Sequence, residues 1–388
     1  MKHVAFVGGM VFDSYKEEFI KANIICRDGY IIEVSSSYLP SGYEQINVSG
    51  KYIIPGLVDV HTHGIKGGDF NEADENMIGK MRRAYAKNGT TSFMATLASY
   101  PLTRIYNSIY AINQHRIDES YDKANIIGIH MEGRYLNPEM KGAHALELLA
   151  LPNLNELQSL CYIMVPSPMH FSIAPELEGG KEFIMKAREL GATVGIAHTK
   201  ATYEECEEAV SLGACSFTHT FNAMTPIHHR MPGAAICSLT NDTVYTELIC
   251  DGEHVHPAMV RLAYKTKPHD KLVLITDSMQ ATDHVDGYYG VAGSGVIVKN
   301  GRATKDDGTL AGSTLTMFKA LKNTMKFCGI GLNKALRFAT LNPAKMVGAD
   351  FVGSIEKNYR ADFILLDNIE NPEIQDVYIG GNKINRGE

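Results

Sequence analysis

Short apolar segments that end in a histidine or an acidic residue recur along this chain of 388 residues. The first covers residues 56–63 and ends in His61 and His63. Later segments of the same kind end at Glu132, His198, His219 and Asp277. Such runs, rich in β-branched residues, are typical of buried parallel strands. Polar groups at the carboxyl ends of several parallel strands are typical of the functional face of a (β/α)₈ barrel.

The number of such strands also favours a barrel. We predict eight strands, ending near Asp59, Thr96, Glu132, Ala174, His198, His219, Cys250 and Asp277. Helix-like segments separate many of them, for example Glu75–Lys87, residues 179–190 and Tyr203–Leu212. Alternation of strands and helices indicates βαβ units and a parallel sheet. We therefore predict an α/β protein with a TIM-like (β/α)₈ barrel over residues 56–347 as its catalytic domain.

The two ends of the chain differ from this middle part. Residues 1–55 contain short strand-like pieces separated by turn signals such as Asp28-Gly29. The C-terminal stretch contains two more, at residues 362–367 and 377–382. We predict that residues 1–55 and 348–388 together form a small β-sandwich domain, into which the barrel is inserted.

Composition and charge limit the classes of partner. The formal net charge is −7, which disfavours broad binding to nucleic acid or to an anionic membrane surface but leaves room for a small anionic substrate. No apolar run approaches the roughly 20 residues of a transmembrane helix, and the N-terminus does not resemble a signal peptide. Seven scattered cysteines without a CxxC pair fit reduced thiols. These features predict a cytoplasmic protein.

His61 and His63 are the first candidate metal ligands. Residues two apart on a strand face the same side, so both imidazoles can point at one ion. Histidine is the commonest metal ligand at neutral pH. A pair of polar residues at a strand end is the alternative for this motif alone, but further ligand-type residues at the ends of other predicted strands favour a metal site.

With these segments assembled, the chain resembles the amidohydrolase superfamily and, within it, the N-acetylglucosamine-6-phosphate deacetylase family. The resemblance covers nearly the whole chain. It is carried by residues 55–64, 130–133, 141–144, 197–199, 218–224, 251–257, 276–279 and 308–313. The chain departs from the family pattern at Arg134, where a proline is usual, and at Ala145-Leu146, where a proline commonly follows His144 by two residues.

The resemblance implies a divalent metal, which Glu132, His198 and His219 would hold as its primary ligands. Nitrogen and oxygen donors suit zinc, iron(II), manganese or cobalt. Because His61 and His63 are present, Glu132 could bridge a second ion, giving one or two ions per subunit. The alternative is that the pair only forms hydrogen bonds near a single ion.

Two further residues would take part in the chemistry. Asp277 matches the family's general base and acid, and His144 matches a residue that contacts the substrate and polarises the acetyl carbonyl. For Asp277 the structural alternative is the N-cap of a following helix. For His144 it is a surface loop. The glycine-containing loop 308–313 is expected on the substrate side, with Ser313 or Thr314 capping a helix that begins near Leu315.

The resemblance also assigns residues to the phosphorylated end of the sugar. Asn222 and Ala223 match residues that hold the phosphosugar, and Arg230 and His254 match residues that contact its phosphate, one or both across the interface of a homodimer. Surface charge for Arg230 and strand-end capping for Asn222 are the alternatives. We expect His228, His229 and His256 to be structural or exposed to solvent.

The resulting hypothesis is hydrolysis of the N-acetyl group of N-acetylglucosamine 6-phosphate to glucosamine 6-phosphate and acetate, in amino-sugar catabolism. The alternatives are deacetylation of N-acetylgalactosamine 6-phosphate or an N-acyl amino acid, and a non-catalytic metal-binding protein. Loss of Asp277 or of a metal ligand would have favoured the last, and none is lost. A screen with and without the phosphate would separate the enzymatic alternatives.

Overall fold

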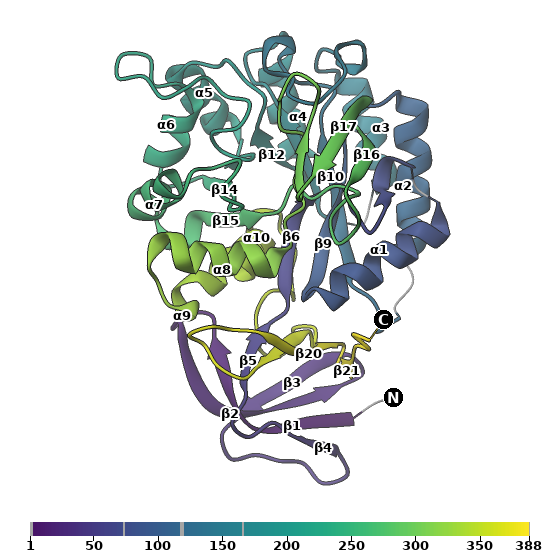
Figure 1. Cartoon of the computed structure of the whole chain (residues 1–388), viewed down its shortest axis with the longest axis vertical. Coiled ribbons are helices and arrows are strands. Elements are labelled where there is room, and N and C mark those ends of the chain that lie inside the picture. The colour runs from purple at the N-terminus through teal and green to yellow at the C-terminus, as the bar shows by residue number, and fades with distance from the viewer. Residues whose placement is uncertain (1–2, 73, 117–119, 165–166, 388) are drawn as a thin grey trace.

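The computed structural model describes residues 3–72, 74–116, 120–164 and 167–387. It has two parts, a barrel surrounded by helices and a smaller sheet that joins the two ends of the chain (Figure 1). Residues 1–2 and 388, which the predicted small domain includes, lie outside the described residues. The division of the chain at residues 55–56 and 347–348 stays a prediction.

Eight parallel strands form the barrel, as predicted. In sheet order they are β6 (Leu57–Thr62), β9 (Thr90–Leu97), β10 (Asn125–Glu132), β11 (Met169–Ile173), β12 (Thr193–Ile196), β13 (Ser216–Phe217), β14 (Tyr245–Ile249) and β15 (Leu272–Ile275). The first and last strands come together where the Asp277 amide donates to the His61 carbonyl at 2.9 Å and the His63 amide donates to the Ser278 carbonyl at 2.8 Å. These bonds bring the predicted base next to the histidine pair.

Helices follow the strands in turn and surround the barrel (Figure 1). They are α1 (Glu75–Lys87), α2 (Leu102–Arg116), α3 (Leu154–Met164), α4 (Gly180–Glu189), α5 (Tyr203–Leu212), α6 (Gly233–Thr240), α7 (Pro257–Thr266) and α8 (Met317–Cys328). Local sequence sets several of their starts. Helix α5, for example, begins with a capping box in which Thr202 and Glu205 exchange side-chain and backbone hydrogen bonds.

Short elements complete the barrel part. They are the helices α9 (Leu332–Ala335) and α10 (Leu341–Met346), the 3₁₀ turns η1 (Phe70–Glu72), η2 (Pro138–Met140), η3 (Leu146–Leu148), η4 (His269–Lys271) and η5 (Leu336–Ala339), and the strand pair β7 (Gly64–Ile65) and β8 (Gly68–Asp69). In the described part of the chain, no helix is long and apolar enough to span a bilayer.

Between β15 and α8 the chain forms an antiparallel three-stranded sheet that the sequence analysis did not predict. Its strands are β16 (Gly287–Val291), β17 (Ser294–Lys299) and β18 (Arg302–Thr304). The predicted helix start near Leu315 lies within two residues of the observed one, but the predicted cap at Ser313 or Thr314 was wrong. Helix α8 begins at Met317 after Thr316, and the Ser313 hydroxyl donates to the Thr276 carbonyl at 2.6 Å instead of capping it. Ser313 therefore ties the loop to the end of β15.

The smaller part is a mixed sheet built from both ends of the chain, seen as purple and yellow strands in Figure 1. Its strands are β1 (His3–Asp13), β2 (Glu18–Arg27), β3 (Tyr30–Ser35), β4 (Glu44–Asn47), β5 (Tyr52–Pro55), β19 (Phe363–Leu366), β20 (Ile374–Ile379) and β21 (Asn382–Lys383). Antiparallel pairing of β5 with β19 joins the two ends. A separate apolar cluster that includes Phe6, Ile24 and Phe363 stabilises this sheet by removing its apolar surface from water.

Candidate active site

The candidate ligands converge at the carboxyl ends of the barrel strands. Glu132 is the last residue of β10, and His198, His219 and Asp277 each lie two residues beyond β12, β13 and β15. Since carboxyl ends of parallel strands meet at one edge of a barrel, residues 145 positions apart in sequence reach the same place. For Asp277, the alternative of a helix N-cap is wrong, because the next helix begins only at Met317.

Three of these residues adopt left-handed backbone conformations. The φ angles of His198, His219 and Asp277 are 44°, 34° and 49°. Such conformations cost of the order of 1–3 kcal/mol for residues other than glycine and persist where the surrounding structure enforces them. Here they turn the side chains inward directly after the strands, so they favour a functional role for the cluster.

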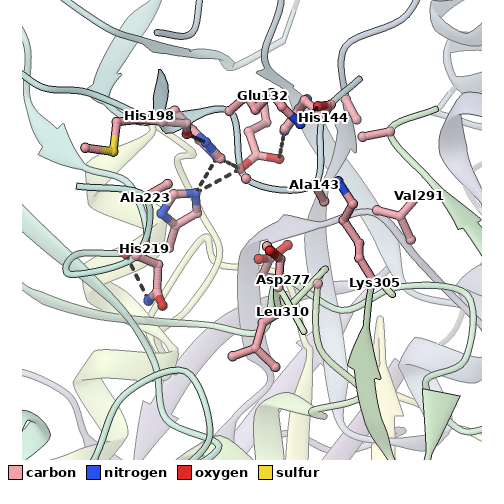
Figure 2. Close-up of a pocket in the computed structure, with 18 of the residues that line it drawn as sticks. Glu132, Ala143, His144, His198, His219, Ala223, Asp277, Val291, Lys305 and Leu310 are labelled. Carbon is pink, nitrogen blue, oxygen red and sulfur yellow. Dashed lines mark hydrogen bonds and ion pairs between the residues drawn. The ribbon is translucent and has the colours of Figure 1, made fainter. Parts of the chain in front are cut away.

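Glu132 lies at the centre of two groups of ligand-type atoms. One contains His198 and His219, and the other contains His61 and His63. Its Oε1 lies 3.0 Å from His219 Nε2 and 3.5 Å from His198 Nε2. The two imidazole Nε2 atoms are 3.1 Å apart (Figure 2). This convergence of nitrogen and oxygen donors fits one cation.

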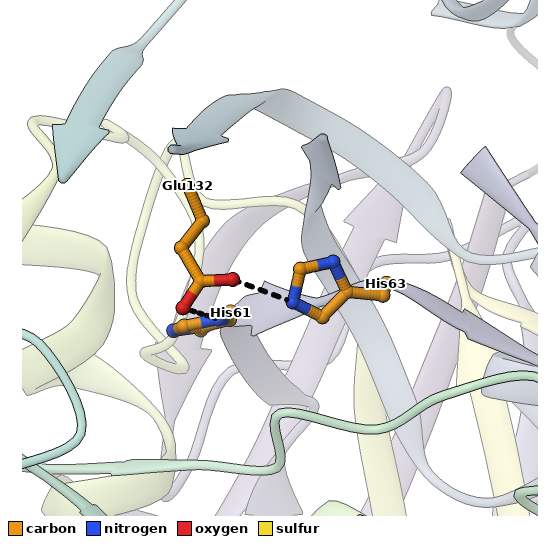
Figure 3. A group of neighbouring side chains, drawn as sticks. All are labelled: His61, His63 and Glu132. Atoms are coloured by element: carbon orange, nitrogen blue, oxygen red, sulfur yellow. Dashed lines mark ion pairs between the residues drawn. The ribbon is translucent and has the colours of Figure 1, made fainter. Parts of the chain in front are cut away.

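The second group shares the same carboxylate. His63 Nε2 lies 3.0 Å from Glu132 Oε2, and His61 Nε2 lies 3.4 Å from Glu132 Oε1 (Figure 3). Both histidines are buried, and neither ring nitrogen of His61 has a hydrogen-bond partner among the described residues. Buried polar atoms are normally satisfied, so a second cation or a water fits this group.

Local hydrogen bonds and charges prepare these groups for binding a cation. The short contact of 2.7 Å between His198 Nδ1 and the Met140 carbonyl requires a proton on Nδ1, which leaves the Nε2 lone pair facing Glu132. Burial raises the pKa of Glu132, but the charge of His61 and hydrogen bonds from other imidazoles outweigh it and hold this pKa well below its usual range. The carboxylate is therefore ionised at neutral pH.

Asp277 faces the same centre. Its Oδ1 lies 3.2 Å from His63 Nε2 and 3.6 Å from His61 Nε2. Burial raises the pKa of Asp277, yet the charge of His61 and the hydrogen bond from His63 outweigh this effect and lower it. The side chain also lines the adjoining cavity, so it can reach a bound molecule as well as the histidines.

A cavity of about 690 Å³ opens over this cluster (Figure 2). This volume suits a small-molecule ligand. Of the residues predicted at the site, His63, Glu132, His144, His198, His219, Asn222, Ala223, His254 and Asp277 line it. His144 is buried beside the centre, with its Nε2 3.6 Å from Glu132 Oε2, so the surface-loop alternative for it is wrong.

The expected phosphate residues differ in position. His254 lines the cavity, and its Nδ1 donates to Asp251 Oδ2 at 2.6 Å. Burial lowers the pKa of His254, but the hydrogen bond and charge of Asp251 outweigh it and raise this pKa. Arg230 is exposed and its Nη1 lies 2.9 Å from His229 Nε2, so its side chain is directed at its own loop. His256 caps helix α7, as expected of a structural residue.

Part of the cavity wall was not predicted from the sequence. Lys305, which Figure 2 labels, and Arg302 come from the segment that contains β18 and line the cavity. Lys141 lines it as well. They add positive charge to a site predicted to take an anion. No local pattern marks Lys305 and Arg302 as site residues, because only the path of the three-stranded sheet brings them to the barrel mouth.

The departures from the family pattern lie outside this wall. The Arg134 guanidinium points toward Glu156, with Nε 3.4 Å from Glu156 Oε2, and its Nη1 donates to the Tyr100 carbonyl. Ala145 precedes the turn η3, and its amide donates to the Ala292 carbonyl.

Comparison with known proteins is consistent with this geometry. The sequence model of the amidohydrolase family matches residues 52–384. The chain belongs to the amidohydrolase family. Among curated amidohydrolase relatives, the N-acetylglucosamine-6-phosphate deacetylase of Lysinibacillus sphaericus is 31% identical over 341 residues, covering 88% of each chain. The N-acetylgalactosamine-6-phosphate deacetylase of Escherichia coli O157:H7 is 33% identical and covers 85% of this chain and 86% of its own.

Solved structures extend the similarity to the whole fold. The N-acetylglucosamine-6-phosphate deacetylase of Thermotoga maritima aligns with a TM-score of 0.88 at 29% identity, covering 99% of this chain and 100% of that one. A mutant of the Mycobacterium smegmatis N-acetyl-D-glucosamine-6-phosphate deacetylase, in complex with N-acetyl-D-glucosamine-6-phosphate, aligns with a TM-score of 0.89 at 30% identity, covering 99% of both chains.

Proposed function

We propose that this amidohydrolase is a metal-dependent deacetylase that hydrolyses N-acetylglucosamine 6-phosphate to glucosamine 6-phosphate and acetate. The observation that carries the proposal is the position of Asp277, which contacts the Glu132-centred cluster and faces the cavity at once. A metal-binding scaffold needs no acid beside its ligands and no cavity of this size. The similarity to deacetylases over nearly the full length supports the same reaction.

The residues present fit a divalent metal. Glu132, His198 and His219 would hold one ion, and His61 and His63 with the shared Glu132 would hold a second. Zinc, iron(II), manganese and cobalt all accept this donor set. When bound, such an ion lowers the pKa of a water and polarises a carbonyl group.

The protein's own groups would then complete the hydrolysis. Asp277 would accept a proton from the attacking water, whose oxygen adds to the acyl carbon. His144 would donate a hydrogen bond to the carbonyl oxygen as negative charge develops there. Asp277 would return the proton to the amine nitrogen as the C–N bond breaks, releasing acetate and the amino sugar.

The phosphate end of the substrate would lie toward Asn222, Ala223 and His254. A histidine with a raised pKa is a suitable partner for a phosphate. Arg230 does not line the cavity of its own chain, and we propose that it serves the site of a second subunit in a homodimer.

Replacing Arg230 by alanine should raise KM for the phosphorylated substrate much more than KM for its unphosphorylated analogue. The reason is that the ionic contact removed by the substitution is made only with the phosphate. Arg83 is an exposed residue of helix α1, and its Nε lies 3.3 Å from Asp122 Oδ2. The variant Arg83→Ala provides the control. Equal effects of Arg230→Ala on both substrates would show that Arg230 does not read the phosphate. If the site is shared between subunits, mixing Arg230→Ala with His254→Ala protein should restore part of the activity.

The proposed function is tested by measuring acetate release with metal-reconstituted protein. The panel contains N-acetylglucosamine and N-acetylgalactosamine, each with and without the 6-phosphate, and one N-acetyl amino acid. We expect the highest kcat/KM for N-acetylglucosamine 6-phosphate. The Escherichia coli relative makes N-acetylgalactosamine 6-phosphate the second candidate, and preference for it would correct the sugar but keep the reaction. No acetate from any member would contradict the proposal.

A further inference from the structure

We infer that Ser99 is a positioning residue that holds His144 in the tautomer with its proton on Nε2, so that His144 can act as a hydrogen-bond donor in the cavity. The catalytic consequence rests on the function proposed above, whereas the tautomer itself can be tested without any activity.

Ser99 is fully buried two residues after β9, and it contacts His144 through two atoms. Its Oγ lies 2.9 Å from His144 Nδ1, and its backbone amide donates to the same nitrogen at 3.4 Å. A backbone N–H can only donate a hydrogen bond. Nδ1 must therefore be the acceptor, and in a neutral imidazole the proton then resides on Nε2.

A second contact supports the same direction for the serine hydroxyl. The backbone amide of Arg134 donates to Ser99 Oγ at 2.8 Å. With Oγ accepting this bond, its own hydrogen is available for His144 Nδ1. The chain of donors runs from the Arg134 amide through the Ser99 hydroxyl to the imidazole, and it leaves the Nε2 proton to face the cavity and Glu132 Oε2.

The backbone at residues 133–134 is shaped for this contact. Gly133 has φ 121° and Arg134 has φ 67°, both in the left-handed region. A Cβ on residue 133 would lie 2.3 Å from Ser99 Oγ and 3.1 Å from His144 Cε1, so only glycine fits between the two side chains. A proline at position 134 would have no N–H to donate. The arginine found here therefore allows a hydrogen bond to Ser99 that the proline usual in the family could not make.

The first test is the ring ¹⁵N spectrum of histidine-labelled protein, with the His144 signals assigned by their loss in His144→Ala. We expect an unprotonated Nδ1 and a protonated Nε2 in the wild type. In Ser99→Ala the 2.9 Å hydroxyl contact is lost and only the longer amide contact at 3.4 Å remains, so we expect a measurable share of the other tautomer. A protonated Nδ1 in the wild type, or an unchanged tautomer in Ser99→Ala, would overturn the inference even if the protein deacetylates as proposed.

The second test is kinetic. Ser99→Ala should lower kcat about tenfold with little change in KM, since it weakens a group that acts on the developing oxyanion. Ser99→Thr, which keeps the hydroxyl, should restore most of kcat. The matched control is Ser108→Ala on helix α2, which removes an equally buried serine hydroxyl that donates to the Asn71 carbonyl. It should leave kcat unchanged.

Two comparisons distinguish an effect of Ser99 through His144 from a nonspecific disturbance of the active site by the substitution. If Ser99 acts through His144, the double variant with His144→Ala should be no slower than His144→Ala alone. The loss caused by Ser99→Ala should also shrink for an N-trifluoroacetyl substrate, whose carbonyl carbon needs less activation. Additive losses, or equal losses on both substrates, would overturn the inference. Absence of acetate release by the wild type would instead contradict the proposed function.

Discussion

Replacing Asp277 by asparagine is expected to lower turnover by at least about 10²-fold while the protein still folds and binds metal. The amide keeps the size of the side chain but cannot accept and return a proton. The left-handed backbone at this position, φ 49°, is also compatible with asparagine. The measurement is steady-state acetate release beside metal content and thermal unfolding.

Asp283 offers a matched control for this substitution. Its φ is 53°, and its carboxylate is exposed, 3.6 Å from Lys66 Nζ. Asp283→Asn therefore makes the same chemical change in the same backbone conformation and should leave turnover unchanged. Near-wild-type turnover in Asp277→Asn would show that another group moves the proton.

Removing the shared carboxylate should have the largest effect on metal binding. Glu132 belongs to both ligand groups, so Glu132→Ala is expected to lose both ions and to reduce activity to background. The double variant His61→Gln, His63→Asn should keep one ion per subunit, whereas the wild type should bind two. Metal analysis after saturation with excess metal and desalting gives these numbers directly.

Two outcomes would contradict this prediction. If the wild type and the double histidine variant both saturate at one ion per subunit, the second site does not exist, and the histidine pair only forms hydrogen bonds near a single ion. If Glu132→Ala retains both ions, the carboxylate is not a ligand. Glu207→Ala, which removes an exposed carboxylate that accepts a hydrogen bond from Tyr203 on helix α5, is the control for loss of a glutamate.

Much of the barrel could be predicted because its signal is local. Each strand is a short apolar run bounded by turns, and burial in a parallel sheet requires such runs. The position of Glu132 at the end of β10 follows from that pattern directly. The predicted strand ends near His198 and His219 exceed the observed ends by two residues, because the left-handed turns that present these side chains leave no apolar signature.

The sequence by itself determined the fold class and the candidate ligands, since hydrophobic periodicity and residue type are properties of short segments. Only the tertiary structure decided which distant groups meet. Closure of the barrel between β6 and β15 places Asp277 beside His63, and the path of the chain through β18 carries Lys305 into the cavity. The contact between Ser99 and His144 depends on two loops that follow different strands. Such contacts between distant residues depend on loop conformation and on closure of the barrel. Neither leaves a periodic pattern in the sequence, so no local pattern could reveal these contacts.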